Sequence, residues 1–116
     1  MTIYNPDNWV VVKIQHKGSH YYKVLGGWSG GYLNGSSWRM NSGIVSCQEF
    51  SDYVDYFVFK GSSGSEYRCG KESYGLRMNN AGTWARLEEL YGDKVELMPE
   101  DTDWMNINWN LPEVVA

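Results

Sequence analysis

The sequence predicts an α+β domain, a mainly antiparallel β-sheet with one principal helix, at about residues 81–91, packed on it. Many short β-branched and aromatic segments alternate with glycine- and serine-rich turns, whereas a single late segment has helical periodicity. The strand–helix alternation of a doubly wound parallel fold is missing. The length of 116 residues suits one domain, so we assign residues 1–116 to it, with a loose tail from residue 111.

The first strands are expected in the run WVVVKI and directly after it. Alternation places Val10, Val12 and Ile14 on one face of that strand. Residues 16–20 (HKGSH) have turn composition, and residues 21–25 form a second strand that runs into a glycine-rich stretch.

The middle of the chain predicts further strands at residues 38–40 and 44–50. Residues 54–60 (VDYFVFK) are a strong strand, with the phenylalanines on one side. The GSSGS turn at 61–65 closes a hairpin, and residues 66–69 return from it.

The helix is predicted from the segment TWARLEELY, in which Trp84, Leu87 and Tyr91 fall on one stripe. Either Asn80 or Thr83 can cap its start, because both side chains can accept a hydrogen bond from a free backbone N–H group.

Gly92 is suited to end the helix in a left-handed conformation. Beyond it, residues 95–98 and 104–109 are expected to form a closing hairpin around the acidic turn at 99–103.

Charge is distributed unevenly along the chain, whose net charge is −4. Residues 1–86 carry nine basic and six acidic side chains, whereas residues 87–116 carry one basic and eight acidic ones. A small anion is therefore expected to bind the first part, while a long nucleic acid would be repelled by the acidic tail. No apolar run approaches the ~20 residues that span a bilayer, so we expect a soluble protein without a membrane partner.

Two cysteines and two histidines give little basis for a metal site. Cys47 and Cys69 are expected to be buried thiols, as in a reducing cytosol. His16 and His20 are four residues apart, but the intervening glycine and serine favour a turn over a metal-binding helix face. No metal or cofactor is expected.

The segment GWSGG, residues 27–31, matches the nucleophile turn G-x-S-x-G of α/β-hydrolases at Ser29. The residues that follow do not begin a helix, and both histidines precede the serine, unlike the chain order of that fold. Neither a Walker A sequence nor G-x-G-x-x-G is present. We predict that the protein is not an enzyme.

A glycine–serine turn precedes an aromatic–arginine pair twice, in GSSWR (35–39) and GSSGSEYR (61–68). Each supplies hydroxyl donors, backbone N–H groups, a ring and a guanidinium, which suit a ligand with a phosphate and a flat base. The alternative is two ordinary hairpin turns with solvated arginines. Trp28 precedes the first turn and is a second candidate for base stacking.

The segment YGLRMNN, residues 74–80, joins the sheet to the helix. Arg77 could hold an anion, Tyr74 could stack on a base, and Asn79 could read the edge of that base. The alternative is that the asparagines cap the helix and Tyr74 packs in the core.

Aromatic residues make up 16% of the chain, more than one sheet and one helix readily bury. Some are therefore expected to line a pocket or an interface between copies, most simply a homodimer or a higher homo-oligomer. The candidate ligand-binding residues, chosen by chemistry, are Trp28, Arg39, Arg68, Tyr74, Arg77 and Asn79.

Five segments together resemble a small family of tailed-bacteriophage proteins: GGWSGGYL (26–33), SWRMNSGI (37–44), SSGSEY (62–67), YGLR (74–77) and EDTDW (100–104). The likeness covers roughly residues 20–110. This family is similar to the Thoeris anti-defence proteins, sponges that sequester cyclic ADP-ribose signals. The resemblance implies a non-catalytic, oligomeric nucleotide binder in the cytoplasm of an infected bacterium. The alternative is a phage structural or protein-interaction module with an aromatic interface and no nucleotide ligand.

Overall fold

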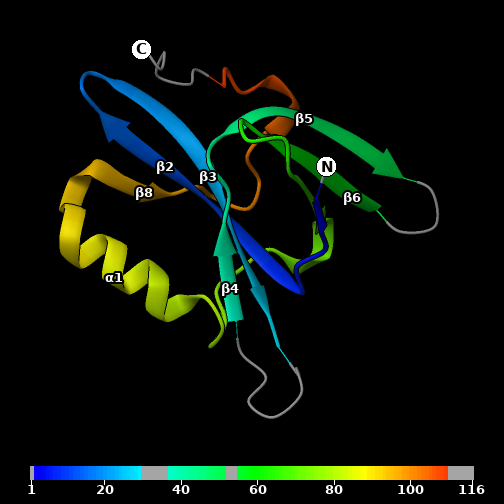
Figure 1. Ribbon diagram of the computed structural model, residues 1–116, viewed down its shortest axis with the longest axis horizontal. Coiled ribbons are helices and arrows are strands. Elements are labelled where there is room, and N and C mark those ends of the chain that lie inside the picture. The colour runs from blue at the N-terminus through cyan, green and yellow to red at the C-terminus, as the bar shows by residue number, and fades with distance from the viewer. Residues whose placement is uncertain (1, 30–36, 52–54, 110–116) are drawn as a thin grey trace.

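The computed structural model describes residues 2–29, 37–51 and 55–109, and it confirms the α+β prediction (Figure 1). The strands divide between two four-stranded sheets, and one principal helix packs on one of them. The tail predicted from residue 111 and residues 30–36 of the glycine-rich stretch lie outside the described residues.

Sheet 1 has the strand order β1-β7-β6-β5. The pairing of β1 with β7 is parallel, and the other two pairings are antiparallel. Its strands are β1 (Ile3–Tyr4), β5 (Ile44–Ser51), β6 (Asp55–Gly61) and β7 (Glu66–Gly70). The predicted hairpin turn at 61–65 is confirmed between β6 and β7, with Gly64 at a positive φ of 93°.

Sheet 2 is antiparallel throughout, with the order β4-β3-β2-β8. Its strands are β2 (Asn8–His16), β3 (Ser19–Trp28), β4 (Ser37–Met40) and β8 (Val95–Leu97). The predicted turn between the histidines is confirmed: Lys17 and Gly18 have φ values of 49° and 79° and join β2 directly to β3. Such consecutive positive φ values match the twist of a two-residue hairpin.

Strand β2 lies between two hydrophobic cores. Trp9 and Val11 face sheet 1, whereas Val10 and Val12 face the helix, so alternate residues of one strand serve both cores. Figure 1 shows the same arrangement, with α1 (yellow) on one side of the β2–β3 hairpin and the β5–β6 hairpin on the other.

The predicted helix is confirmed as α1 (Ala81–Tyr91). Trp84 and Leu87 pack against the second core, whereas Tyr91 at the end of the predicted stripe is 52% exposed. Gly92 ends the helix with a positive φ of 57°, which glycine permits, but its ψ of −125° lies outside the left-handed helical conformation that was predicted. Among the described residues, no helix is long and apolar enough to cross a membrane.

The predicted closing hairpin is wrong. Strand β8 pairs with β2, with Val12 opposite Leu97 and Ile14 opposite Val95. Residues Trp104–Asn106 form a 3₁₀ helix instead of a strand, and short 3₁₀ helices also occur at Lys71–Ser73 and Gly92–Lys94. The reason lies in tertiary packing, because β2 offers an unpaired edge to β8, and the buried Trp104 packs against Trp9 at 5.7 Å between ring centroids.

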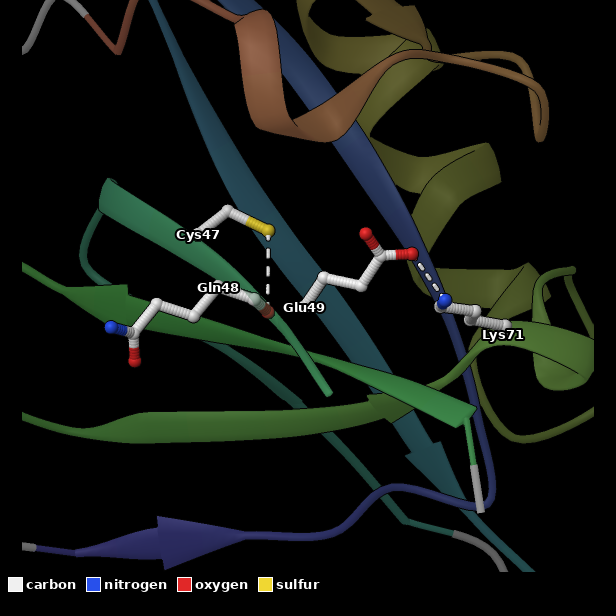
Figure 2. Close-up of polar contacts among 4 residues, drawn as sticks. All are labelled: Cys47, Gln48, Glu49 and Lys71. Carbon is white, nitrogen blue, oxygen red and sulfur yellow. Dashed lines mark hydrogen bonds and ion pairs between the residues drawn. The ribbon is translucent and has the colours of Figure 1, made fainter. Parts of the chain in front are cut away.

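The two thiols lie in sheet 1. Cys69 is fully buried, and Cys47 is partly buried against the same core. Burial raises the pKa of Cys47 to about 12 and that of Cys69 well above its ordinary value, and the Glu49 carboxylate adds to the first shift. Figure 2 shows Cys47 beside Glu49, whose carboxylate forms an ion pair with Lys71.

We predict that both thiols of the folded protein react slowly with the disulfide reagent DTNB at pH 8. Only the thiolate is nucleophilic, so a pKa near 12 makes Cys47 react about a thousandfold more slowly than an ordinary cysteine. Absorbance at 412 nm checks this, with the same protein in 6 M guanidinium as the fast control. A native Cys47 as fast as the unfolded control would contradict the assignment.

The absence of a side chain at Gly27 of β3 lets Asn79, two residues before α1, pack directly against this strand. A Cβ at this position would lie 2.0 Å from Oδ1 of the buried Asn79. We predict that Gly27→Ala lowers the free energy of unfolding by roughly 3 kcal/mol, because backbone and a hydrogen-bonded amide must both move. Gly82→Ala is the matched control: it meets no atom within 4 Å and raises stability by up to about 1 kcal/mol. Urea denaturation of both variants measures the difference, and equal midpoints would contradict the close packing.

Candidate functional site

A polar pocket of about 730 Å³ lies where the two sheets meet at β1, β4 and the β6–β7 turn. We call it the inter-sheet pocket. It joins parts of both glycine–serine motifs, which are distant in sequence. Its lining residues are Thr2, Tyr4, Lys23, Arg39, Met40, Asn41, Ser42, Ser63, Gly64, Ser65 and Tyr67.

Two cations line this pocket. The guanidinium of Arg39 lies 4.7 Å from the centroid of the Tyr4 ring, and Lys23 enters from β3. Neither forms an ion pair with a carboxylate in the described part of the chain. The charge of Arg39 is therefore available to an anion in this pocket, whereas the ammonium group of Lys23 lies toward the Tyr21 ring.

Strand pairing explains why Arg39 points into the pocket. Arg39 is opposite Gly26 in the β3–β4 ladder, on the same face of sheet 2 as the core residue Val24. This face looks toward sheet 1, where Tyr4 packs on Tyr67 at 4.9 Å between centroids. Arginine and tyrosine thus meet between the sheets.

Serine hydroxyls form the opposite wall. The Oγ atoms of Ser42 and Ser62 lie 2.7 Å apart, and the hydroxyl of Ser42 donates to Oγ of Ser63 at 3.2 Å. The backbone N–H of Ser63 donates to Oγ of Ser42 at 3.0 Å. These bonds hold the β6–β7 turn against the segment that follows β4.

Asn41 contributes a buried amide to the pocket wall. Its side chain is 4% exposed, and its Oδ1 accepts a hydrogen bond from the N–H of Val24 at 2.9 Å. The Nδ2 atom of this amide is buried and has no partner among the described residues. A buried donor of this kind costs about 1–3 kcal/mol when unpaired, and such donors occur at sites that take a further polar partner.

Tyr67 is a neutral phenol at physiological pH. Burial raises its pKa to about 12, and the nearby Arg39 guanidinium offsets only part of this shift. Tyr67 therefore keeps its hydroxyl proton, and it does not place a negative charge beside the two cations.

Tyr74, a candidate for base stacking, is partly buried and packs against both cores. Its hydroxyl accepts a hydrogen bond from the N–H of Val11 at 3.2 Å and donates one to the carbonyl of Met98. The N–H of Met98 donates in turn to the carbonyl of Val11. The phenol hydroxyl thus bridges the Val11 N–H and the Met98 carbonyl, in place of a direct backbone hydrogen bond between the two chain segments. Burial raises the pKa of Tyr74 to about 12.

Asn79, the candidate for reading a base edge, is internal. Its amide exchanges two hydrogen bonds with the amide of Asn8, at 3.0 and 2.6 Å. Its second N–H donates to Oγ of Ser29 at 2.8 Å. The polar atoms of Asn79 are all used within the protein, as is the serine of the G-x-S-x-G segment.

Asn80 is the N-cap residue of α1, but its side chain does not cap the helix. Its Oδ1 accepts from the N–H of Arg77 at 2.9 Å, and its amide donates to the carbonyl of Leu25 at 3.3 Å. The alternative for this segment was that the asparagines cap the helix and Tyr74 packs in the core. Tyr74 does pack against the core, but the capping is wrong: Asn80 makes no side-chain cap bond, and the two asparagines instead anchor the segment to β2 and β3.

The other four candidates lie in different places. Arg77 is exposed on the segment that precedes α1, away from the inter-sheet pocket. Trp28 packs edge-on against Tyr4 at 6.2 Å, one ring away from the inter-sheet pocket. Arg68 is exposed between the buried Tyr67 and Cys69, so it points away from the space between the sheets. Of the six candidates, Arg39 alone is among the described lining residues of the pocket.

Several lining residues were missed in the sequence. Tyr4 comes from a two-residue strand, and Lys23 from a strand in which it is simply one polar position. Asn41 and Ser42 carried a signal, because only Met40 separates them from the first aromatic–arginine pair. Their polar character in a region of strands was the observation that could have identified them.

Comparisons with known proteins add no assignment: no protein-family model, no curated protein and no solved structure matches this chain.

We predict that Tyr74→Phe destabilises the protein by about 1–3 kcal/mol, because the Val11 N–H and the Met98 carbonyl both lose their hydroxyl partner. Urea denaturation monitored by tryptophan fluorescence measures the change. Tyr56→Phe is the control, since that hydroxyl makes no hydrogen bond within the described chain and its loss leaves the midpoint unchanged. Equal midpoints for the two variants would refute the bridging role.

Proposed function

We propose that the protein binds a small phosphorylated nucleotide in the inter-sheet pocket and holds it without turnover. The observation that carries this proposal is the convergence of Arg39, the rings of Tyr4 and Tyr67 and the serine turn on one polar cavity. A guanidinium offers charge-assisted, often bidentate hydrogen bonds to phosphate, and hydroxyl and backbone N–H donors complete such a site.

Charge and size both favour an anion of nucleotide dimensions. No aspartate or glutamate occurs among the described residues that line the pocket, although acidic residues outnumber basic ones in the whole chain. A volume of about 730 Å³ lies in the range of roughly 300–1,000 Å³ typical of small-molecule sites. The rings of Tyr4 and Tyr67 supply flat surface for a base.

Binding without catalysis fits the chemistry of this lining. Apart from Met40, its described side chains are hydrogen-bond donors or cations, and they include no histidine or carboxylate, the groups that most often act as general base. A long nucleic acid is disfavoured because the net charge is −4.

The resemblance to phage sponge proteins names the class of nucleotide to test first. We propose a cyclic ADP-ribose type of signal, sequestered in the cytoplasm of an infected bacterium. The site residues that support this differ in part from those chosen by chemistry in the sequence: Arg39 stays, whereas Tyr74 and Asn79 are engaged in internal hydrogen bonds.

We predict that Arg39→Ala weakens binding of cyclic ADP-ribose by about 10- to 100-fold, the effect of losing a hydrogen bond to a charged group. Isothermal titration calorimetry at low ionic strength measures the dissociation constant. Arg39→Lys recovers only part of the affinity, because an ammonium group cannot reproduce the planar fork.

Arg68→Ala is the matched control for this experiment. It removes an equal charge from the second glycine–serine motif, at a position on the outward face of sheet 1, so affinity should change little. Chromatography of the ligand released by heat should return it chemically unchanged. No binding by any cyclic nucleotide, or equal affinities of the parent and Arg39→Ala, would overturn the proposal.

A protein-interaction module remains the second candidate, and exposed apolar side chains favour it. Trp38 is 53% exposed on the edge strand β4, and Met78 and Leu90 are also exposed. Sedimentation velocity tests this reading together with the expected homo-oligomer: Trp38→Ala should lower the association constant if β4 forms the interface.

A further inference from the structure

A second cavity lies on the other face of sheet 2, between the β2–β3 hairpin and the C-terminal end of α1. We call it the hairpin groove, and its volume is about 850 Å³. Ile14, Tyr21 and Met40 line it from the strands, and Leu87, Tyr91 and Lys94 line it from the helix and the turn after it.

The groove exists because α1 is shorter than the hairpin beneath it. Eleven helical residues span about 16 Å, whereas the ten residues of β3 span roughly 33 Å. The helix therefore covers Val10, Val12 and Leu25 but stops before the end of the hairpin. Ile14, Tyr21 and Met40 are left half-buried beyond it.

The surface of the groove is mixed: apolar and aromatic side chains lie beside polar ones near the β2–β3 turn, among them Gln15, His16 and His20, and beside cations. Lys23 projects into it, with its ammonium group 5.8 Å from the centroid of the Tyr21 ring, and Lys94 lies at the helix end. The groove residues within the described chain include no aspartate or glutamate. Burial lowers the pKa of Lys23, as expected for a cation that lacks a carboxylate partner.

We infer that the hairpin groove is a second ligand site, for a small flat aromatic anion. Tyr21, Tyr91 and the aliphatic side chains contact the ring, and Lys23 and Lys94 attract the anionic group. Aromatic stacking and opposite charge are the two interactions that such a ligand needs. This site goes beyond the proposed function and does not rest on it.

The two cavities adjoin where β4 ends. The β3–β4 ladder stops at the pair Leu25–Met40, so Lys23 lies beyond the end of that pairing and lines both cavities, as does Met40. Variants of these two shared residues would not separate the sites. Tyr91 and Lys94 belong to the groove alone, and Arg39 to the inter-sheet pocket alone.

The test is a titration of the full ¹⁵N-labelled chain with adenosine monophosphate, followed through backbone amide shifts at low ionic strength. We expect saturable shifts in residues 14–23 and 87–95, and we expect them to persist in Arg39→Ala. Adenosine, which has the ring but no charge, should bind more weakly. Shifts that persist in Arg39→Ala separate this site from the inter-sheet pocket. If the inter-sheet pocket binds no nucleotide, the shifts in the groove are still expected.

Two variants and one control locate the interactions. Tyr91→Ala should weaken groove binding roughly fivefold or more through lost stacking. Lys94→Ala should weaken it about 3- to 10-fold, since water screens this exposed charge. Arg86→Ala removes an equal charge from an exposed helix position, where Arg86 pairs with Glu89 at 4.0 Å, and should leave affinity unchanged. Shifts confined to residues 63–67, no shifts at all, or parental affinity in Tyr91→Ala and Lys94→Ala would overturn the inference.

Discussion

Strand β2 is buried on both of its faces, and this constraint organises the molecule. Its residues from Asn8 to Val12 are all inaccessible to water, so one side needs sheet 1 as cover and the other needs α1. Neither cover is optional, because burial of apolar surface contributes about 25 cal/mol per Å² and an uncovered face would forgo it. The helix therefore matters for stability even though none of its residues is fully buried.

No residue of α1 is fully buried, so apolar packing alone does not fix its position. Polar contacts attach the segment before the helix to β2. The amide pair of Asn8 and Asn79 and the hydroxyl of Tyr74 make these contacts, together with the bond from the Gly75 N–H to the Trp9 carbonyl at 2.8 Å. Buried polar groups must be paired, so this network specifies one position for the helix. Side chains with the chemistry of ligand recognition are consequently engaged in holding the fold together.

Each candidate site lies at a part of sheet 2 that its neighbouring element, either strand β4 or helix α1, does not reach. The inter-sheet pocket opens where the β3–β4 ladder stops, and the hairpin groove opens where α1 stops. Their described lining residues include cations and no carboxylates, although the chain carries a net charge of −4. Positive side chains are thus concentrated at the two cavities of a protein that is acidic as a whole.

The sequence by itself determined the class of fold, the single helix and most strands, because these depend on local periodicity and turn residues. The alternation of Val10, Val12 and Ile14 and the stripe of Trp84 and Leu87 are local patterns, and both are confirmed. Only the tertiary structure decided the partner of β8, since a short strand pairs with whichever edge is open and β2 offered one. It also decided which polar residues line a cavity. Arg39 and Asn79 were both candidates by their chemistry, but strand pairing turns the first into the pocket, whereas the packing of the helix end on Gly27 buries the second.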